Sequence, residues 1–386
     1  MSTDDPARRL RGHCYRVGGC VRDALLSRPS QDRDWVVVGS SPEEMVLAGF
    51  VPVGKDFPVF LHPQTREEYA LARTERKSAP GYHGFTFHAD PDVTLEQDLA
   101  RRDLTINAMA MDDDGSLIDP FQGARDLQAR VLRHVSPAFA EDPVRLLRTA
   151  RFAARFDTFE VHPDTRQLMR QLVQGGEVDA LVAERVWQEL SKGLMEGHPG
   201  RMLQVLQECG ALQKLLPEVN LGERLLKVLE QCAKIQAPLA VRWACLMLDV
   251  SHENPSVQLA QHVADRLKVS TECRALADVV TREHGHIHQS DGLSAEATLR
   301  LLERCDALRR PDRFAHVLQA CECDARGRLG FQDPAYAPAH RLPHALQQVL
   351  MVDTEPVVRQ AQAQGLDGPA LGQAVRQARI LALQAL

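Results

Sequence analysis

YRVGGCVRDALLSRPSQDRDWVVVG, residues 15–39, is the stretch that decides how this chain is organised. It predicts a β-strand that ends at a glycine pair, a short helix over CVRDALL, and a second strand that begins within DRDWVVVG. Glycine lets backbone N–H groups approach phosphate oxygens closely, and a helix start favours an anion. The charged residues Arg22, Asp32 and Asp34 lie near this turn and at the start of the next strand. The stretch therefore predicts a sheet end that binds an anion together with a cation.

Asp32 and Asp34 flank Arg33 at the start of the second strand. Side chains at positions i and i+2 of a strand project to the same face, so both carboxylates can meet one divalent cation. Hard oxygen ligands at this spacing suit Mg²⁺, which takes one or two carboxylates together with substrate phosphate oxygens. Such ions activate an attacking hydroxyl and stabilise the leaving oxygen in a displacement at phosphorus. Glu68, in the run EEYALAR, is a candidate for a third catalytic carboxylate from a neighbouring strand.

Neither half of this pattern is decisive alone. A lone DxD also fits a polar turn before a buried strand, and a lone glycine pair also fits an ordinary turn. Here Asp32 follows Gly19 by 13 residues, with one helical pattern between them. Arg22 adds a fork of donors for a triphosphate. The combination predicts a site for a triphosphate and magnesium.

The composition is that of an ordinary soluble globular protein. The chain has 386 residues, of which 44% are hydrophobic and 25% charged, enough for two or three domains. No apolar run reaches the roughly 20 residues of a membrane span. The opening residues 1–12 contain no apolar segment, so we expect a mobile leader in a cytoplasmic protein. The nine cysteines form no CxxC pair, which disfavours a redox motif or a zinc knuckle.

The formal net charge of −6 argues against a protein that coats nucleic acid indiscriminately. It does not exclude a nucleic-acid substrate, because binding depends on where the cations lie rather than on their sum. The class of substrate therefore has to be inferred from the motifs.

The chain changes character near residue 136. Before it, short runs rich in β-formers, such as CYRV, DWVVVG and PVFLHP, alternate with helical patterns, and AMAMDDDGSLIDP reads as a hairpin turned at DG. After it, apolar residues recur at three- and four-residue spacing and strand signals disappear. The predicted fold class is therefore α+β. Its parts are an α/β head with a mixed sheet at 13–135, a helical neck and body at 136–220, and a helical body and tail at 221–386.

EDPVRLLRTARFAARF, residues 141–156, is the most informative helical segment. Asp142, Arg145, Arg148 and Arg151 recur in it every three residues. Each step of three turns the helix by about 300°, so neighbours in the series are offset by about 60°. Asp142 and Arg145 can therefore engage one planar ligand together, while Arg148 and Arg151 point progressively aside.

The chemistry of Asp142 and Arg145 suits a nucleobase. Cytosine and adenine both present an amino donor beside a ring acceptor, so a carboxylate that accepts and a guanidinium that donates fit either base. Uracil and guanine present the reverse order and would leave buried groups unpaired, at a cost of about 1–3 kcal/mol each. In isolation, the segment also fits an aspartate helix cap followed by a solvated arginine face.

Two further segments of the head add candidate residues. LARRDLTINAMA places Arg102 at a helix end, where it is a candidate phosphate ligand, and Asp103 and Asn107 can organise the turn that follows. Residues 72–86, ARTERKSAPGYHGFT, are polar and contain Pro and Gly, which predicts a mobile loop that closes over the site. An ordinary surface loop has the same composition.

Four motifs in this order resemble those of one family. VGGCVRDALL, DRDWVV, RRDLTINAMA and EDPVRLLRTARF are similar to motifs of the class II tRNA nucleotidyltransferases, the CCA-adding enzymes, over residues 14 to about 215. The intervening GKDFPVFLHPQTREEYALARTERKS resembles the bacterial CCA-adding branch rather than the bacterial poly(A) polymerases. The resemblance implies a transferase that adds C, C and A to tRNA 3′ ends from CTP and ATP without a nucleic-acid template.

The resemblance also implies roles for the candidate residues. Asp32 and Asp34 would hold Mg²⁺, and Asp142 with Arg145 would select the base. The nucleotide phosphates or sugar would be contacted by Gly19, Arg22, Arg102, Arg148 and Arg151. The family has a head, neck, body and tail, which agrees with the α/β-then-helical pattern.

The C-terminal half departs from many bacterial relatives, which carry a metal-dependent HD phosphohydrolase domain there. Where a His-Asp pair would be expected, the sequence has Leu248 before Asp249. The segment REHGHIH, with His284, His286 and His288, is interpreted as solvated. We therefore expect a degenerate helical domain without phosphohydrolase activity, kept for packing or for holding tRNA.

Several alternatives share parts of these motifs. A partial enzyme that adds only CC or only A, and a poly(A) polymerase, would use the same head chemistry. A catalytically inactive RNA-binding protein would not need Asp32 and Asp34, because binding alone requires no metal ligands. The sequence predicts no membrane partner and does not specify an oligomeric state.

Overall fold

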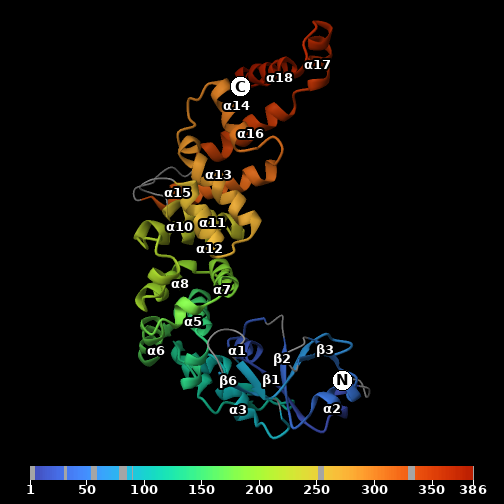
Figure 1. The fold of residues 1–386 in the computed structure, drawn as a ribbon, viewed down its shortest axis with the longest axis vertical. Coiled ribbons are helices and arrows are strands. Elements are labelled where there is room, and N and C mark those ends of the chain that lie inside the picture. Colours follow the sequence, from blue (N-terminus) through green and yellow to red (C-terminus); the bar gives the residue numbers. More distant parts are fainter. Residues whose placement is uncertain are drawn as a thin grey trace. The chain divides into compact units, whose positions relative to one another are not determined.

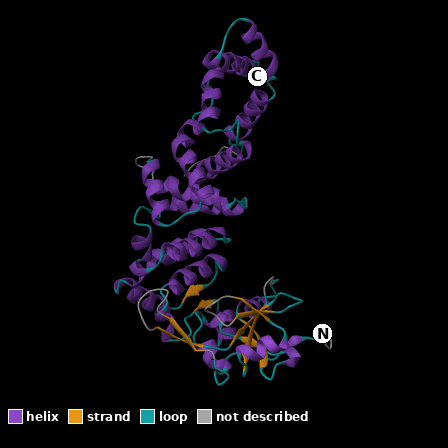
Figure 2. Cartoon of the chain, turned by 45° about the vertical axis from the view of Figure 1, so that its right-hand side comes forward, coloured by secondary structure: helices purple, strands orange, loops and turns teal. Residues whose placement is uncertain are grey.

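The computed structural model describes residues 5–29, 33–53, 59–77, 85–88, 90–250, 256–328 and 335–385. Strands lie in the N-terminal part of the chain, and the rest of the described chain is mostly helical (Figures 1 and 2). The predicted α+β class, with a mixed sheet followed by helices, is confirmed. No described helix is long and apolar enough to cross a membrane.

A seven-stranded mixed sheet is the framework of the head. Its strand order is β3-β4-β5-β2-β1-β8-β9, and β2–β5 is its one parallel pair among the described strands. Its strands are β1 (His13–Val17), β2 (Asp34–Val38), β3 (Val51–Val53), β4 (Val59–Leu61), β5 (Glu68–Leu71), β8 (Ala110–Met111) and β9 (Leu117–Ile118). Two small sheets pair β6 (Thr74–Lys77) with β7 (Phe85–His88), and β10 (Val131–Leu132) with β11 (Glu160–Val161).

Helices supply the rest of the regular structure. The first group is η1 (Pro6–Arg9), α1 (Gly19–Leu25), α2 (Pro42–Ala48), α3 (Leu95–Ala100), η3 (Thr105–Asn107), α4 (Gly123–Ala129), η4 (Pro137–Glu141), α5 (Val144–Arg155), α6 (Pro163–Gln174), η5 (Glu177–Ala180), α7 (Ala183–Met195), α8 (Pro199–Glu208) and α9 (Ala211–Leu215). The second group is α10 (Glu223–Lys234), α11 (Leu239–Val250), α12 (Val257–Arg266), α13 (Thr271–His288), α14 (Ala295–Arg304), α15 (Pro311–Gly327), α16 (Pro338–Leu350), α17 (Thr354–Ala363) and α18 (Gly368–Gln384).

Both faces of the large sheet are buried, because the residues of β2 alternate between two apolar clusters. Trp35 and Val37 pack in one cluster, together with Met45 of α2. Val36 packs in the other cluster, together with Leu99 of α3. Successive side chains of a strand point to opposite faces, which explains the uninterrupted apolar run WVVV. Polar chemistry is therefore left to the ends of the strands.

Two turns of the head test the sequence patterns. The predicted hairpin at AMAMDDDGSLIDP is confirmed, because β8 pairs antiparallel with β9 and Gly115 takes a φ of 88° that glycine adopts without strain. The loop predicted over 72–86 is wrong at its flanks, where β6 and β7 pair as antiparallel strands. Residues 78–84 lie outside the described residues, so the closing motion predicted for this loop stays a prediction.

The chain divides into two compact units. One comprises residues 1–190 with 201–215, and the other comprises 191–200 with 216–386. The predicted boundary at 135/136 falls inside the first unit, because α5 is bonded to the head. The predicted boundary at 220/221 lies close to the change of unit after residue 215. The finer division into head, neck, body and tail stays a prediction.

The leader predicted to be mobile over residues 1–12 is ordered from Asp5 onward. It forms the short helix η1, which Asp5 caps by accepting from the backbone N–H of Ala7. Ala7 and Leu10 pack against the cluster that lies under α2. The segment therefore contributes to the core of the head, and residues 1–4 lie outside the described residues.

Gly327→Ala is expected to lower the stability of the second unit. A Cβ at this position of α15 would lie 3.0 Å from the backbone N of Val228 and closer still to its Cγ2, so α10 and α15 would have to move apart. Overpacking of this kind costs roughly 1–3 kcal/mol. Thermal and urea unfolding followed by circular dichroism measure the effect.

The matched control is Gly285→Ala in α13, where an added Cβ meets no atom within 4 Å. Alanine is the better helix former by roughly 0.5–1 kcal/mol, so this variant is expected to be at least as stable as the wild type. Equal destabilisation by the two substitutions would contradict the packing argument.

Candidate active site

The glycine pair forms a turn that requires glycine at its first position. Gly18 has a φ of 74° and a ψ of −128°, and the next residue begins α1. A Cβ at Gly18 would lie 2.9 Å from Nη1 of Arg102, so this guanidinium lies directly against the turn. Nη2 of Arg102 is 3.2 Å from Oδ2 of the buried Asp98, whereas its buried Nε has no partner among the described residues. A phosphate oxygen bound at the turn would satisfy that donor.

Asp34 and Glu68 begin adjacent parallel strands in the same register. Asp34 is the first residue of β2, Glu68 is the first residue of β5, and the two are direct partners across the pair. Direct partners project to the same face of a sheet, so two exposed carboxylates share one sheet end. Carboxylate oxygens are the donors that a hard divalent cation such as Mg²⁺ prefers.

Asp32, the other predicted metal ligand, lies outside the described residues. Within the described ranges, no group of three or more His, Cys, Asp and Glu side chains could hold a metal ion. Asp34 and the predicted third carboxylate, Glu68, therefore lie together at one sheet end, whereas the position of Asp32 is not described. The assignment of Asp32 and Asp34 as metal ligands stays a prediction.

Arg22 is buried beneath the turn. Its side chain is 3% exposed, Nε donates to Oδ1 of Asp23 at 2.9 Å, and Nη1 donates to Oδ1 of Asn107 at 2.5 Å. Its guanidinium also lies 5.2 and 5.4 Å from the ring centroids of Phe152 and Phe156. Burial lowers the pKa of Arg22 below the ordinary arginine value, against the opposing charge of Asp23. Arg22 therefore joins α1 to α5, and its contact with a nucleotide stays a prediction.

Asp103 ties the helix α5 to the head. Its Oδ2 accepts from Nε of Arg148 at 2.7 Å, and its Oδ1 accepts from Nδ2 of Asn107 at 3.0 Å and from the backbone N–H of Leu104 at 2.8 Å. Burial would raise the pKa of Asp103, but the charge of Arg148 and these hydrogen bonds outweigh it and keep that pKa well below its ordinary value. The same pair raises the pKa of Arg148. Both groups therefore stay ionised at neutral pH.

These bonds form one continuous network that meets α5 at two places. Its members, in order, are Arg148, Asp103, Asn107, Arg22, Asp23 and Arg155. Arg155 closes the network because its Nη2 lies 2.9 Å from Oδ2 of Asp23. Arg148 and Arg155 are about two helical turns apart, which places them on the same side of α5. The network therefore holds the helix against the glycine turn at two levels.

The arginine face of α5 is paired with carboxylates rather than solvated. Nε of Arg151 donates to Oε2 of the buried Glu189 in α7 at 2.7 Å, and Nη1 of Arg148 lies 4.0 Å from Oε1 of the same residue. The alternative interpretation, a solvated arginine face, is therefore wrong. Arg148 and Arg151 remain candidates for nucleotide contacts, but their described partners are carboxylates of this chain.

Asp142 and Arg145 are each fixed by protein groups. Oδ1 of Asp142 accepts from the backbone N–H of Val144, the first residue of α5, at 3.1 Å, and both carboxylate oxygens accept from the guanidinium of Arg185 at 3.1 and 2.7 Å. Arg145 is buried, and its Nη1 donates to the carbonyl oxygen of Ala138 at 2.7 Å. The two predicted base readers are therefore held in place from outside their own helix, which limits their freedom to adapt to a wrong base.

The structure gathers the predicted residues in two groups. One group lies at the end of the sheet and consists of the glycine turn, Arg102, Asp34 and Glu68. The other lies on α5 and at its start, and consists of Asp142, Arg145, Arg148 and Arg151. Arg22 lies between the groups and belongs to the network that joins them.

Sequence reasoning missed three residues that position the predicted ones: Asp98, Arg185 and Glu189. Asp98 precedes Arg102 by four residues, and the helical i,i+4 spacing of opposite charges is a signal that points to it. Arg185 and Glu189 lie on α7, some forty residues beyond their partners on α5, and no local pattern marks them.

A second polar cluster lies in the other compact unit. Oδ2 of Asp324, which is 1% exposed, accepts from Nη2 of Arg328 at 3.0 Å and lies 2.9 Å from Nε2 of His288, while Oδ1 accepts from Arg224. Burial would raise the pKa of Asp324, but these partners keep it well below its ordinary value. The interpretation of REHGHIH as solvated holds for His286, 64% exposed, and is wrong for His288, 11% exposed.

A mixed sheet with a glycine turn and a carboxylate-bearing central strand, joined to the arginine-rich helix α5, is the arrangement expected of a nucleotidyltransferase head. Residues 14–133 match the poly A polymerase head domain. Residues 158–221 match a second family description, the probable RNA and SrmB-binding site of polymerase A. Nucleotidyltransferases of this class generally use a divalent metal ion.

The chain belongs to the family of the multifunctional CCA proteins. The Multifunctional CCA protein of Variovorax paradoxus (strain S110) is 56% identical over 414 residues, which cover 96% of this chain and 99% of that protein. The predicted membership of the CCA-adding enzymes is thereby confirmed. The aligned length exceeds the 386 residues of this chain, so the relative contains residues that this chain lacks.

Solved structures of CCA-adding enzymes have the same fold. The structure of the Bacillus stearothermophilus CCA-adding enzyme in complex with CTP gives a TM-score of 0.71 at 23% identity and covers 100% of this chain and 94% of that one. The Thermotoga maritima CCA-adding enzyme complexed with tRNA gives a TM-score of 0.69 at 22% identity and covers 99% and 90%. At these identities the likeness establishes the fold and not the details of the site.

Asp103→Asn is expected to destabilise the first unit by about 1–3 kcal/mol at neutral pH, because Arg148 loses its charged partner. The pKa of Asp103 in the folded protein is lowered, whereas an unfolded aspartate titrates near about 3.9. Such a group contributes stability above the unfolded pKa, and the contribution is lost as pH falls through the folded pKa. The variant is therefore expected to lose less stability than the wild type on acidification from about pH 5 to about pH 2.

Urea unfolding at a series of pH values compares the two proteins. Other carboxyl groups titrate in both proteins, so the quantity of interest is the difference between their free energies of unfolding at each acidic pH. A difference that stays constant as the pH falls would show that Asp103 is not held ionised by its partners.

Proposed function

We propose that this protein is a CCA-adding tRNA nucleotidyltransferase, which adds C, C and A to tRNA 3′ ends from CTP and ATP without a nucleic-acid template. The observation that carries the proposal is the network from Arg148 to Arg155, because it joins a turn suited to a triphosphate to a helix suited to C and A. The CCA proteins to which the chain is related, and the similar folds solved with CTP and with tRNA, support the same substrates.

In the reaction, the tRNA 3′ hydroxyl attacks the α-phosphate of the nucleotide, a new O–P bond forms and pyrophosphate leaves. The glycine turn lets the triphosphate approach the backbone, and the spare Nε of Arg102 donates to a phosphate oxygen. Asp32 and Asp34, with Glu68 beside Asp34, would hold Mg²⁺. The bound ion supplies positive charge at the phosphates and lowers the pKa of the attacking hydroxyl.

Base selection belongs to Asp142 and Arg145. The carboxylate accepts from the amino group of cytosine or adenine, and the guanidinium donates to the ring acceptor beside it. Arg185 and the carbonyl group of Ala138 fix the two side chains, so a base with the reverse donor pattern leaves polar groups unpaired. Arg148 and Arg151 lie further along the same helix and would contact the nucleotide phosphates or sugar.

The second compact unit has no phosphohydrolase role in this proposal. Leu248 stands where the histidine of an HD pair would be, and the buried carboxylate of Asp324 is paired with two arginines and a histidine instead of being open to a metal ion. The unit instead serves packing or tRNA binding. We place the protein in the cytoplasm, where tRNA is processed.

The proposal is tested with purified protein, Mg²⁺ and a tRNA that lacks its terminal CCA, supplied with CTP and ATP singly and together. Two C residues with CTP alone, followed by one A when both nucleotides are present, are expected. Asp34→Asn is expected to reduce incorporation more than about 100-fold, because a metal-ligating carboxylate is lost, while tRNA affinity stays nearly unchanged. The control Asp113→Asn changes the charge equally at an exposed position of the β8–β9 turn.

Other products would identify the alternatives. A long A tail indicates a poly(A) polymerase, a stop after CC indicates a partial enzyme, and tRNA binding without any product indicates an inactive RNA-binding protein. An Asp34→Asn variant as active as the wild type would contradict the metal assignment.

Asp142→Ala and Arg145→Ala are expected to relax the choice among nucleotides rather than only slow the reaction. Each loss of a partner removes about 1–3 kcal/mol of discrimination, which is roughly 5- to 150-fold in the ratio of kcat/KM for CTP over UTP. Arg185→Lys tests the positioning of Asp142 and is expected to lower the same ratio by a smaller factor. A uniform loss of rate with all four nucleotides would contradict the base-reading role.

A further inference from the structure

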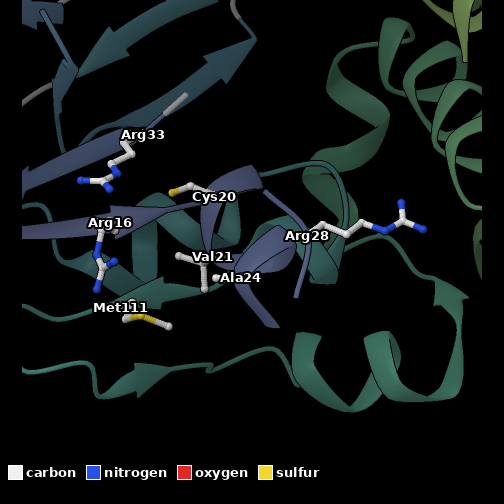
Figure 3. Close-up of a pocket in the computed structure, with 7 residues that line it drawn as sticks. All are labelled: Arg16, Cys20, Val21, Ala24, Arg28, Arg33 and Met111. Carbon is white, nitrogen blue, oxygen red and sulfur yellow. The ribbon is translucent and has the colours of Figure 1, made fainter. Parts of the chain in front are cut away.

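The head contains a positively charged pocket that the predicted site residues do not account for. It has a volume of ≈ 200 Å³ and is lined by Arg16 of β1, Arg28, Arg33, Cys20 and Met111, together with two apolar residues of α1 (Figure 3). Among the lining residues that the structure describes, three are arginines and none is acidic, although the whole chain has a net charge of −6. The pocket is therefore a local centre of positive potential.

Arg16 and Arg33 have spare hydrogen-bonding capacity. Across the described ranges the guanidinium of Arg16 makes no hydrogen bond or ion pair. The side chain of Arg33 is 61% exposed, and its Nη1 lies 3.7 Å from Oε1 of Glu67, which is beyond hydrogen-bond distance. In Figure 3 these two side chains lie on the same side of the pocket and the sulfur of Cys20 points toward them, whereas Arg28 points away. Arg28 lies over the ring of Phe156, 5.0 Å from its centroid.

The size of the pocket fits a phosphate group rather than a nucleotide. Pockets that enclose a whole small-molecule ligand usually have about 300–1,000 Å³. The pocket therefore suits one phosphate with part of its sugar.

The pocket adjoins the catalytic strand. Sγ of Cys20 lies 4.0 Å from the backbone carbonyl oxygen of Asp34, and Arg33 directly precedes Asp34 in the chain. The donors for the incoming triphosphate, at Gly18 and Arg102, are not part of its lining. A phosphate held here would belong to a second reactant at the same sheet end.

We propose that Arg16 and Arg33 bind a backbone phosphate of the RNA substrate close to its 3′ end. The identity of the RNA rests on the proposed function. The planar guanidinium fork matches phosphate oxygens in charge and geometry, which suits a diester on a strand that must be positioned. Pyrophosphate and free phosphate present the same chemistry, and the experiment separates them from RNA.

The test compares the double variant Arg16→Gln/Arg33→Gln with the wild type. Its KM for tRNA lacking CCA, and its Kd for that tRNA, are expected to rise roughly tenfold, with kcat and the KM for CTP nearly unchanged. The plot of log Kd against log salt concentration is expected to become shallower by about 0.7, the effect of one lost phosphate contact on a single strand.

Two control variants separate the pocket from general charge effects. Arg8→Gln/Arg125→Gln removes the same charge from exposed positions of the head and is expected to leave tRNA binding nearly unchanged. Glu67→Gln removes the negative charge beside Arg33 while its amide oxygen can still accept from Nε1 of Trp35, so it is expected to strengthen tRNA binding.

Alkylation of the wild type gives a readout that needs no variant. Cys20 lines the pocket, whereas burial raises the pKa of Cys14 to about 12 and keeps that thiol unreactive. The tRNA is expected to protect Cys20 from N-ethylmaleimide, read by peptide mass spectrometry, and CTP alone is not. Failure of tRNA to protect Cys20 would overturn the proposal even if the double variant did not fold.

The remaining outcomes of these experiments also support or contradict the proposal. Equal weakening by the control pair would overturn the pocket as a specific site. An unchanged KM for tRNA, with inhibition by pyrophosphate or inorganic phosphate weakened, would overturn the RNA assignment in favour of a free anion. A wild type that binds tRNA and protects Cys20 but adds no nucleotide would overturn the proposed function while supporting the pocket.

Discussion

The ion pair between Arg148 and Asp103 is the constraint on which the arrangement of the site depends. It joins α5, next to the predicted base readers, to the turn that follows α3, and Asn107 connects Asp103 to Arg22 under the glycine turn. The network then returns to α5 through Arg155. Neither α1 nor α5 can shift without breaking bonds of buried charged groups, so the network fixes the glycine turn relative to α5.

Such a network adds little to the free energy of unfolding, but it fixes the position of α5 relative to the glycine turn. Burying Asp103 and Arg22 costs desolvation that their mutual attractions only roughly offset, so apolar side chains of the same shape would stabilise the contact as well or better. Apolar contacts, however, are not directional, and α5 could slide along them. A shifted helix here would leave buried charges without partners, which costs several kcal/mol per ion. We therefore attribute the charged network to the placement of Asp142 and Arg145 relative to the turn.

The parts of the fold that could be predicted are those set by local rules. The β-forming residues of DWVVVG predicted the strand β2, the DG turn predicted the β8–β9 hairpin, and the three-residue spacing predicted how the arginines are spread around α5. The parts that could not be predicted depend on distant partners. The sequence predicts Arg22 as a phosphate ligand, but in the structure Phe152 and Phe156 cover its guanidinium. The sequence alone also allows Asp142 to be a simple helix cap, but in the structure Arg185 binds its carboxylate. The leader looks mobile because its polar residues outnumber the two, Ala7 and Leu10, that pack on the core.

The short helix α1 explains how one segment serves three tasks. Each residue of an α-helix is turned by about 100° from the one before it, so seven residues already point in every direction. Gly18, just before the helix, faces Arg102, while Arg22 is directed to α5 and Cys20 to the arginine pocket. A substitution that tilts α1 would therefore disturb the triphosphate turn, the neck contact and the pocket together. This shared dependence gives a physical reason why Gly18, Cys20 and Arg22 lie so close together in the chain.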